Sequence, residues 1–248
     1  MKAMVLAAGL GTRLRPLTDT RPKALVEING RTPLEITLLR LREFGVREVI
    51  VNAHHFADML VEYLHANRNF GMRVEISRED VLLDTGGGLK RAAPFFQRDD
   101  AGRDQPFILH NVDVISTIDL RQMMEFHRAR GALATLAVRD RESSRYLLFD
   151  DGDWLCGKRI EGSEPEIVRT SEPLHKHAFC GIHVISPRFL DMITEDGIFS
   201  ILRPYLRLAG AGEEILAHPT DEYYWRDLGT PESLAQAAQD LQSGTLRL

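Results

Sequence analysis

A short stretch near the N-terminus places two glycines and two basic side chains close together. Gly9 and Gly11 follow the apolar run 3–8, and Arg13 and Lys23 come next along the chain. Glycine lets backbone N–H groups approach a ligand without a Cβ in the way. A guanidinium offers a fixed fork of donors to phosphate oxygens, and an ammonium adds a second positive charge. These residue types in this order predict a binding site for a polyphosphate.

The familiar glycine motifs of nucleotide-binding proteins do not account for this stretch. The dinucleotide motif G-x-G-x-x-G needs a third glycine, and Leu14 stands at that position. A Walker loop needs a Gly-Lys-Ser/Thr sequence, which does not follow. Because tight turns also use glycine, the Gly-x-Gly pair alone is compatible with an ordinary turn.

The longer string from Leu6 to Leu25 is far more specific. It reads Leu-Ala-Ala-Gly-x-Gly-Thr-Arg-x-x-Pro-x-Thr-x-x-x-Pro-Lys-x-Leu, and it resembles the signature of the sugar-1-phosphate nucleotidylyltransferases. The resemblance implies that Arg13 contacts the triphosphate and the leaving pyrophosphate, and that Lys23 contacts the phosphates near the new bond. It also implies nucleotide contacts from Leu6, Ala7, Ala8, Gly9, Gly11, Thr12 and Arg13.

Three consecutive glycines come directly before a predicted helix that ends near Phe96. Glycine destabilises regular structure by roughly 0.5–1 kcal/mol relative to alanine, so their position needs a reason. A flexible linker is one explanation, and close packing of the backbone against a flat base or sugar is another. Members of the resembled family carry a glycine-rich loop here that meets the nucleobase. The resemblance therefore implies nucleotide contacts from Asp84, Thr85, Gly86, Gly87 and Gly88.

Two aspartates far apart in the sequence each lie at or near the end of a predicted strand. Asp113 follows the apolar run 106–110, and Asp227 lies just before Gly229-Thr230-Pro231. Ligands in α/β sheets bind at the carboxyl ends of strands, and Mg²⁺ prefers carboxylate oxygens. Taken alone, an aspartate such as Asp113 is also typical of a turn or a helix N-cap. The resemblance implies that Asp113 and Asp227 together bind Mg²⁺.

Further substrate contacts are implied next to these acids, and some family features are missing. The resemblance assigns substrate contacts to Lys23, Asn111 and Gly181, the last in a segment similar to the family's Gly-x-Tyr/His-x-Ile. Val112 stands where the family usually has glycine. The family's Glu-Lys-Pro sequence is absent from 157–176, so sugar contacts in that region are not transferred.

The implied activity is transfer of a nucleotidyl group from an NTP to a sugar-1-phosphate, giving an NDP-sugar and pyrophosphate. UTP or GTP is the expected nucleotide, and nucleotide-sugar supply for cell-envelope polysaccharide is the expected setting. Within the family, the short length and the Thr-Gly-Gly-Gly sequence look most like N-acetylmuramate-1-phosphate uridylyltransferases and short mannose- or heptose-1-phosphate guanylyltransferases. A phosphocholine cytidylyltransferase and a catalytically silent nucleotide-sugar sensor are the alternatives; the base, the sugar and the oligomeric state stay open.

Hydrophobic periodicity supplies the elements that position these residues. Strands are predicted at 3–8, 46–52, 72–77, 106–110, 132–138, 146–149, 154–156, 179–186 and 214–218. Helices are predicted at 33–44, 57–66, 120–129, 187–193, 201–209 and 231–241, besides the one after the glycines. Asp119 and Thr230 are predicted N-caps.

The alternation of strands and helices predicts an α/β fold. The resemblance implies a three-layer α/β/α Rossmann-like nucleotidyltransferase fold with a mostly parallel mixed sheet and a small α+β substrate lobe. We expect a single nucleotidyltransferase domain over 1–248, with a nucleotide-binding core at 1–140. We expect the sugar-phosphate lobe, with the second metal aspartate, at 141–230. A C-terminal helix is expected at 231–248. No acetyltransferase extension is expected.

Composition is that of an ordinary soluble protein. Of 248 residues, 44% are hydrophobic and 27% charged, enough to bury a sizeable core. A net charge of −5 argues against nucleic acid as a partner. The two cysteines, Cys156 and Cys180, show no Cys-x-x-Cys spacing, which predicts reduced thiols. With no apolar run long enough for a membrane span and no signal peptide, we expect a cytoplasmic protein.

Overall fold

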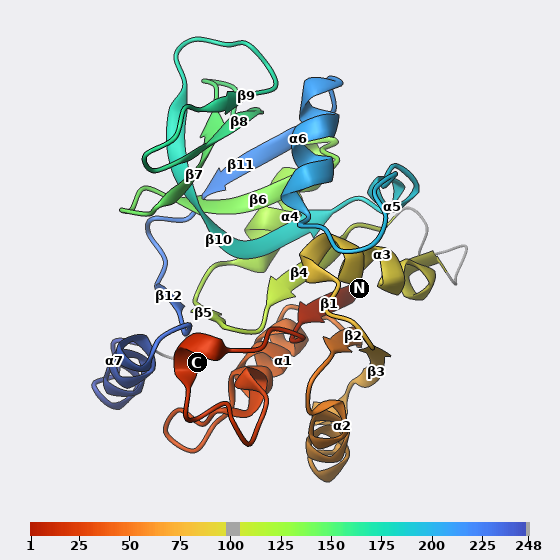
Figure 1. Ribbon diagram of the computed structural model, residues 1–248, viewed down its shortest axis with the longest axis vertical. Helices are drawn as coiled ribbons and strands as arrows, with labels where there is room; N and C mark the ends of the chain where they lie inside the picture. The colour runs from red at the N-terminus through yellow and green to blue at the C-terminus, as the bar shows by residue number, and fades with distance from the viewer. Residues whose placement is uncertain (98–104, 247–248) are drawn as a thin grey trace.

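Apolar strands and amphipathic helices alternate along the chain and build a twisted mixed sheet with helices on both faces (Figure 1). The computed structural model describes residues 1–97 and 105–246. Its strands are β1 Lys2–Leu6, β2 Glu48–Ala53, β3 Arg73–Arg78, β4 Phe107–Asn111, β5 Val114–Ser116, β6 Ala134–Arg139, β7 Arg145–Phe149, β8 Leu155–Ile160, β9 Glu166–Ile167, β10 His175–Ile185, β11 Ile215–Pro219 and β12 Trp225–Asp227.

The helices alternate with these strands. In chain order the α-helices are α1 Pro33–Glu43, α2 Ala57–Ala66, α3 Asp84–Gln97, α4 Leu120–Arg130, α5 Arg188–Asp191, α6 Leu202–Gly210 and α7 Pro231–Gln242. Short 3₁₀ turns add η1 Thr12–Leu14, η2 Lys23–Leu25 and η3 Arg68–Gly71. In the described part of the chain, no helix is long and apolar enough to cross a membrane.

The order of strands reverses at the centre of the sheet. β3, β2, β1 and β4 lie side by side in that order and are all parallel. The chain therefore moves outward from β1 to β3 and then returns to the other side of β1 as β4. Beyond β4 the sheet turns antiparallel, with β10 next to β4 and β6 next to β10. In open α/β sheets such a reversal marks the place where ligands bind, outside the carboxyl ends of the strands.

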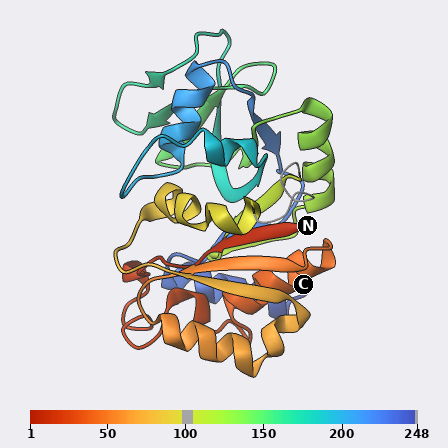
Figure 2. The same ribbon diagram turned by 90° about the vertical axis from the view of Figure 1, so that its right-hand side faces the viewer.

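Successive residues of the central strand β1 face two separate cores, as the alternation of side chains in a strand requires. Met4 belongs to a core formed with α3, α5 and α6. Ala3 and Val5 belong to a second core formed with α1, α2 and α4. Figure 2 shows α2 and α3 on opposite sides of these strands. The three layers follow directly from this two-sided burial.

A second part of the chain, drawn above the parallel strands in Figure 1, is built on the long strand β10. The first residues of β10 pair with β7, which continues through β8 to β9. The later residues of β10 pair with β4 and β6. β10 therefore joins this second layer of strands to the parallel strands.

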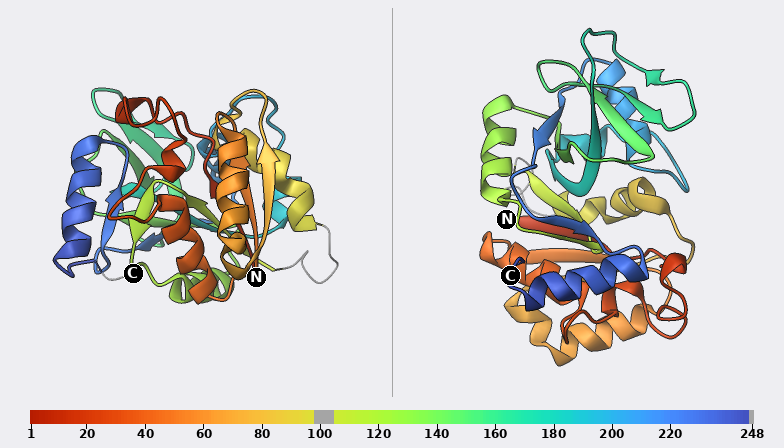
Figure 3. Two further views of the ribbon diagram at one scale, coloured as in Figure 1. Left: turned by 90° about the horizontal axis from the view of Figure 1, so that it is seen from below. Right: turned by 90° about the vertical axis from the view of Figure 1, so that its left-hand side faces the viewer.

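A small antiparallel pair stands apart from the large sheet. β5 pairs with β12, so Asp227 is opposite Val114 and Trp225 is opposite Ser116. α7 follows β12 and lies beside the N-terminal loop, as Figure 3 shows. The Asn29 side chain donates a hydrogen bond to the Ala238 carbonyl at this contact, 2.8 Å away.

Local sequence signals located most elements correctly. The helix at 57–66 has the predicted bounds, and the predicted N-caps accept backbone hydrogen bonds: Asp119 from Arg121 and Gln122, and Thr230 from Ser233. Burial of both free cysteines agrees with the predicted thiols. No strand or helix was predicted over 157–176, and this is wrong in part, because β9 and the ends of β8 and β10 lie there. The last two residues of the predicted C-terminal segment lie outside the described residues.

Two buried histidines make the stability of the folded protein depend on pH. Burial lowers the pKa of His183 to about 3 and the pKa of His110 to about 4. His183 Nδ1 lies 3.0 Å from the Tyr205 hydroxyl inside the core. Both rings are therefore neutral in the folded protein at pH 7, whereas an unfolded histidine takes up a proton near pH 6.5.

We predict that the free energy of unfolding falls when the pH is lowered from 7 to 5. The unfolded state binds protons there that folded His183 and His110 do not, so stability present above pH 6.5 is lost as the pH falls toward about 4. A fully buried histidine contributes up to about 2 kcal/mol of this loss. Urea unfolding at both pH values measures it, and His183→Gln should reduce the loss. His65→Gln on exposed α2 should leave the loss unchanged; an unchanged loss in His183→Gln would contradict the prediction.

Candidate functional site

A cavity of about 350 Å³ lies where the strand order reverses, at the carboxyl ends of β1 and β4. Gly9 lines it from the chain after β1, and Asn111 and Asp113 line it from the end of β4 and beyond. We call this the central cavity; it is lined by Leu6, Ala8, Gly9, Asn52, Leu82, Asp84, Thr85, Asn111, Asp113 and Ile198. Many of the residues predicted from the sequence to bind nucleotide therefore meet in one place.

Among the described glycines, Gly9 is the one that neither packing nor a left-handed φ requires. A Cβ at Gly9 would meet no atom within 4 Å, so the protein itself leaves space beside this backbone. The position lines the central cavity. A glycine with open space above it at a cavity wall suits close approach of a ligand.

A buried polar network, which the sequence analysis missed, supports the wall of the central cavity. The Asn52 side chain accepts a hydrogen bond from the Ala7 N–H at 2.7 Å and donates one to the Glu79 carboxylate at 2.7 Å. The other carboxylate oxygen of Glu79 accepts from the Leu83 N–H at 3.0 Å. β1, β2 and the chain entering α3 are thus tied together. The available signal was Asn52 at the end of an otherwise apolar strand.

The loop after Gly9 brings Lys23 to the cavity. Gly11 has a φ of +63°, and its Cβ would lie only 3.1 Å from the Lys23 Cβ. The Gly11 carbonyl accepts from the Thr18 hydroxyl at 2.9 Å, which closes the loop. Lys23 then reaches Asp113, with its Nζ 2.5 Å from Oδ2 and only 9% of its side chain exposed. The predicted lysine and the first predicted aspartate are therefore in direct contact.

The β5–β12 pair brings the second aspartate to the same place. The Leu228 N–H donates to the Asp113 carbonyl at 2.8 Å, and Asp227 is opposite Val114 in the strand register. Two acids more than a hundred positions apart thus lie on neighbouring backbone segments. No strand was predicted at β5 or β12, because each spans only three residues.

Arg13 lies beside Asp227. A Cβ placed on Gly229 would be 2.4 Å from Arg13 Nη2 and 2.5 Å from Asp227 Oδ1. Asp227 Oδ1 also accepts a hydrogen bond from the Gly229 N–H at 2.7 Å. Gly229 therefore leaves the space that the guanidinium and the carboxylate share. Thr12, the neighbouring predicted residue, is exposed at the start of η1.

Gly181 and Asn111 are also neighbours. Gly181 lies in β10 with a φ of +78°, and a Cβ there would be 2.9 Å from Asn111 Nδ2. β10 is irregular at this point, because its register with β6 shifts between Phe179 and His183. The structure thus brings these two predicted substrate contacts together between β4 and β10.

The three consecutive glycines do not form a loop ahead of the helix, and that prediction is wrong. They lie in the first turns of α3, which begins at Asp84. The N–H groups of Gly86 and Gly87 both donate to the Phe199 carbonyl, at 2.9 and 3.2 Å. A Cβ on Gly86 would lie 2.4 Å from the Phe199 ring. Close packing against the chain's own segment 197–199 therefore explains Gly86 and Gly87.

Gly88, Asp84 and Thr85 have separate environments. A Cβ on Gly88 would lie 2.8 Å from the Glu79 carboxylate, so Gly88 makes room for the Asn52–Glu79 network. The Thr85 hydroxyl accepts from the Ile201 N–H at 2.9 Å. Asp84 is exposed and lines the central cavity. Nucleobase contacts from these residues stay a prediction, and Asp84 and Thr85 have the clearest access.

The two aspartates fit a magnesium site. They offer hard carboxylate oxygens on adjacent backbone segments, and Asp113 already holds a cation, the Lys23 ammonium. Within residues 1–97 and 105–246, no group of three or more His, Cys, Asp or Glu side chains is arranged to hold a metal ion. Mg²⁺ commonly takes one or two carboxylates and completes its shell with substrate phosphates and water. Asp113 and Asp227 match that type of site.

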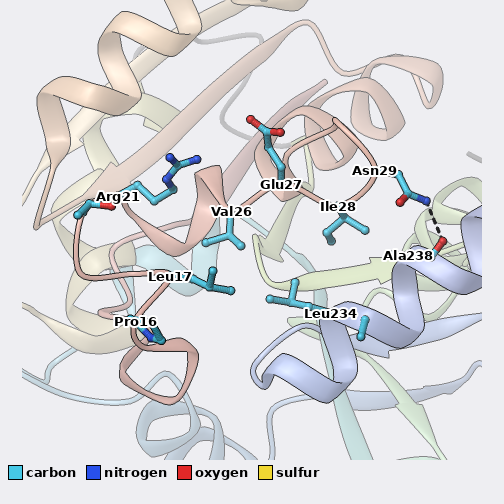
Figure 4. Close-up of a pocket in the computed structure, with 11 residues that line it drawn as sticks. Pro16, Leu17, Arg21, Val26, Glu27, Ile28, Asn29, Leu234 and Ala238 are labelled. Atoms are coloured by element: carbon cyan, nitrogen blue, oxygen red, sulfur yellow. Dashed lines mark hydrogen bonds between the residues drawn. The ribbon is translucent and has the colours of Figure 1, made fainter.

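Another cavity, of about 750 Å³, lies between the loop 16–29 and α7 (Figure 4). Leu17, Val26, Ile28 and Leu234 give it apolar walls. The residues predicted to bind nucleotide, substrate or metal do not line it. Of these two cavities, only the central cavity is lined by residues predicted to bind nucleotide, substrate or metal.

Comparison with known proteins gives a consistent result. The model of the family described as Nucleotidyl transferase matches residues 2–152. The chain is 33% identical to an N-acetylmuramate alpha-1-phosphate uridylyltransferase of Caulobacter vibrioides, over 93% of each chain. It is 29% identical to a UTP–glucose-1-phosphate uridylyltransferase of Synechocystis, covering 100% of this chain and 65% of that protein.

A solved structure shows the same fold. A putative glucose-1-phosphate thymidylyltransferase from Bacillus anthracis, in complex with a sucrose, superposes with a TM-score of 0.81. Sequence identity is 16%, and the match covers 100% of this chain and 97% of that one. The expected Rossmann-like nucleotidyltransferase fold with a mixed sheet is thereby confirmed.

We predict that Gly86→Ala and Gly9→Ala differ sharply in stability. The added methyl of Gly86→Ala meets the Phe199 ring and carbonyl, and such overpacking typically reduces the free energy of unfolding by about 1–3 kcal/mol. The methyl of Gly9→Ala enters open space and should change stability by less than about 0.5 kcal/mol. Urea unfolding of the two variants makes the comparison. Equal stability of both would contradict the assignment of Gly86 to packing.

Proposed function

Because this chain belongs to the nucleotidyl transferase family, we propose that it transfers a nucleotidyl group from an NTP to a sugar-1-phosphate. A phosphate oxygen of the sugar-1-phosphate forms a bond to the α-phosphorus. The bond from the α-phosphorus to the bridging oxygen of the β-phosphate breaks, and pyrophosphate leaves. The products are an NDP-sugar and pyrophosphate. The observation that carries this proposal is the Lys23–Asp113 ion pair at the central cavity, with Asp227 on the backbone segment that pairs beside Asp113.

The reaction places modest demands on proton transfer. The second pKa of a phosphate is near ~6, so the attacking group is mostly a dianion at neutral pH. A protein general base is then unnecessary, and catalysis depends on positioning and on neutralising charge. A mechanism without a general base agrees with a site whose charged side chains are basic residues and carboxylates.

Lys23 and Arg13 are assigned to the phosphates. The Lys23 ammonium lies between the glycine loop and Asp113, so it is placed to contact phosphates near the bond that forms. Arg13 is exposed beside Asp227, where its guanidinium is available to the triphosphate and to departing pyrophosphate. Leu6, Ala8 and Gly9 line the central cavity and are assigned to the nucleotide.

Asp113 and Asp227 are assigned to Mg²⁺. The bound ion would supply charge neutralisation for the triphosphate and polarise the α-phosphoryl group. The Asp227 carboxylate is held in place by the Gly229 N–H, and the Asp113 carboxylate by Lys23. These contacts fix both acids before a ligand binds.

UTP is the favoured nucleotide, and GTP is the alternative. The relative that matches this chain over 93% of both lengths is named for uridylyl transfer, and so is the Synechocystis relative. The chain spans 65% of the Synechocystis protein, so that protein's whole activity is not carried over. A nucleoside triphosphate substrate also favours a cytoplasmic location, which is the location expected from the sequence.

We predict that Asp113→Asn and Asp227→Asn each nearly abolish turnover. Each change removes one negative charge from the proposed metal site and keeps the shape of the side chain. Lys23→Ala should lower kcat at least ~100-fold, as loss of a key charge at the reacting centre typically does. Pyrophosphate release from UTP or GTP with a panel of sugar-1-phosphates measures all three.

Asp58→Asn is the matched control, because Asp58 is exposed on α2 and its ion pair with Arg78 lies at the surface. Its turnover should equal that of the unchanged protein. Full activity of Asp227→Asn at low Mg²⁺ would refute the two-carboxylate site. Binding of NTP and sugar-1-phosphate without turnover in the unchanged protein would favour a sensor instead.

A further inference from the structure

The central cavity has two walls that come from separate segments of the chain. Ala8 and Gly9 line it from the chain after β1, and Asp84 and Thr85 line it from the start of α3. Among the described residues, no backbone hydrogen bond joins the segment 7–11 directly to the segment 80–85. The spacing of the two walls therefore depends on the side chains packed between them.

A series of three hydrogen bonds through Asn52 and Glu79 connects the walls. β2 lies between β1 and β3 in the sheet, and Asn52 is near its carboxyl end. The Ala7 N–H donates to Asn52 Oδ1 at 2.7 Å, and Asn52 Nδ2 donates to Glu79 Oε1 at 2.7 Å. Glu79 Oε2 then accepts from the Leu83 N–H at 3.0 Å. Two side chains thus connect one wall of the cavity to the other.

Burial makes each of these hydrogen bonds costly to lose. Asn52 is 3% exposed and Glu79 is 4% exposed. Away from water, the hydrogen bonds from Asn52 and Leu83 replace the solvation of the Glu79 carboxylate. A buried amide or carboxylate that loses a partner keeps its full desolvation penalty. The link between the walls therefore resists stretching.

The surroundings hold the pair in one position. A Cβ on Gly88 would lie 2.8 Å from Glu79 Oε1 and 2.9 Å from Asn52 Nδ2, so α3 packs directly on the pair. The Glu79 N–H donates to the Ala53 carbonyl at 2.8 Å, and the Glu79 carbonyl lies 2.8 Å from His54 Nδ1. The Glu79 carboxylate is thereby fixed at the N-terminal end of α3, where the helix dipole favours a negative charge.

We propose that Asn52 and Glu79 are positioning residues that set the spacing of the nucleotide-binding walls and thereby lower the KM for the NTP. This inference rests on the proposed function and adds two residues to it. Asn52 lines the central cavity, but its amide oxygen and nitrogen both bond to the protein. The pair therefore acts through the backbone of the two walls and not through contact with the reacting phosphates.

The residues assigned to the phosphates and the metal ion are held by other contacts. Lys23 pairs with Asp113, and Asp227 accepts a hydrogen bond from the Gly229 N–H. Neither contact involves the Asn52–Glu79 pair. A change in the pair should therefore act on nucleotide binding more than on the chemical step, which would raise KM and leave kcat nearly unchanged.

Reversing the donors and acceptors of the pair tests this role. Asn52→Asp alone sets two carboxylates against each other, and Glu79→Gln alone leaves one acceptor oxygen for two N–H donors. We expect each single variant to raise the KM for the nucleotide, UTP or GTP, by ~10-fold, because a buried group loses its partner. The kcat should change by less than about threefold.

The double variant Asn52→Asp/Glu79→Gln restores all three hydrogen bonds. The carboxylate at position 52 accepts from the Ala7 N–H and from the amide nitrogen at position 79, whose amide oxygen accepts from the Leu83 N–H. Its KM for the nucleotide should return to within about threefold of that of the unchanged protein. A pair that only supported stability would lower the free energy of unfolding of the single variants and leave their KM unchanged. Steady-state kinetics and urea unfolding of the same variants separate the two roles.

Thr135→Val is the matched control, because it removes a buried hydrogen bond that lies away from the central cavity. Thr135 is fully buried in β6, and its hydroxyl lies 2.9 Å from His127 Nδ1. This variant should lower the free energy of unfolding and leave KM and kcat for the nucleotide unchanged. If Asn52→Asp does not fold, Glu79→Gln and the double variant decide the test.

An unchanged KM in the single variants, or a double variant no better than the single ones, would overturn the proposal and leave the proposed function intact. Absence of pyrophosphate release from both UTP and GTP in the unchanged protein would instead contradict the proposed function. Calorimetric binding of UTP and GTP then decides the role of the pair. Weaker binding in Glu79→Gln that the double variant restores supports it, and equal binding in all variants overturns it. Binding of neither nucleotide by the unchanged protein would contradict both.

Discussion

The pairing of β5 with β12 is the constraint on which the site depends. Each strand has three residues, yet their register brings Asp227 beside the backbone of Asp113. Without this pairing the two acids would lie on segments with no reason to meet. α7 follows β12 and packs Leu234 and Ala237 against Ile115 and Leu228, so the pair is anchored in a small core of its own. The proposed chemistry thus depends on a long-range contact stabilised by burial.

Cations surround the paired acids before a ligand arrives. The Lys23 ammonium contacts Asp113, and the Arg13 guanidinium lies beside Asp227. Bringing two carboxylates together is unfavourable unless positive charge lies near them. In the proposed reaction, the same two cations would turn to phosphate oxygens when a triphosphate and a metal ion bind. A reaction without a general base requires this kind of preformed electrostatic environment.

Features set by neighbouring residues were predictable from the sequence, and features set by distant ones were not. The N-caps Asp119 and Thr230 and the bounds of α2 depend on local chemistry, and each prediction is confirmed. The glycines of α3 looked like a ligand loop because Phe199, the residue that packs on them, lies more than a hundred positions away. Asn52 was missed for the same reason, because its partners Ala7 and Glu79 lie on other segments. Arg13 and Lys23 were predicted because they lie in the motif from Leu6 to Leu25, and Asp113 and Asp227 were predicted from the resemblance to the same family.

Binding of Mn²⁺ as a stand-in for Mg²⁺ tests the central claim most directly. Electron paramagnetic resonance follows the bound ion in the presence of a non-hydrolysable UTP analogue. The account predicts that Asp113→Asn and Asp227→Asn each weaken this binding by at least the ~10-fold that loss of an outer-shell partner causes. Undiminished Mn²⁺ binding in both variants would contradict it, because the ion would then be held without the paired acids.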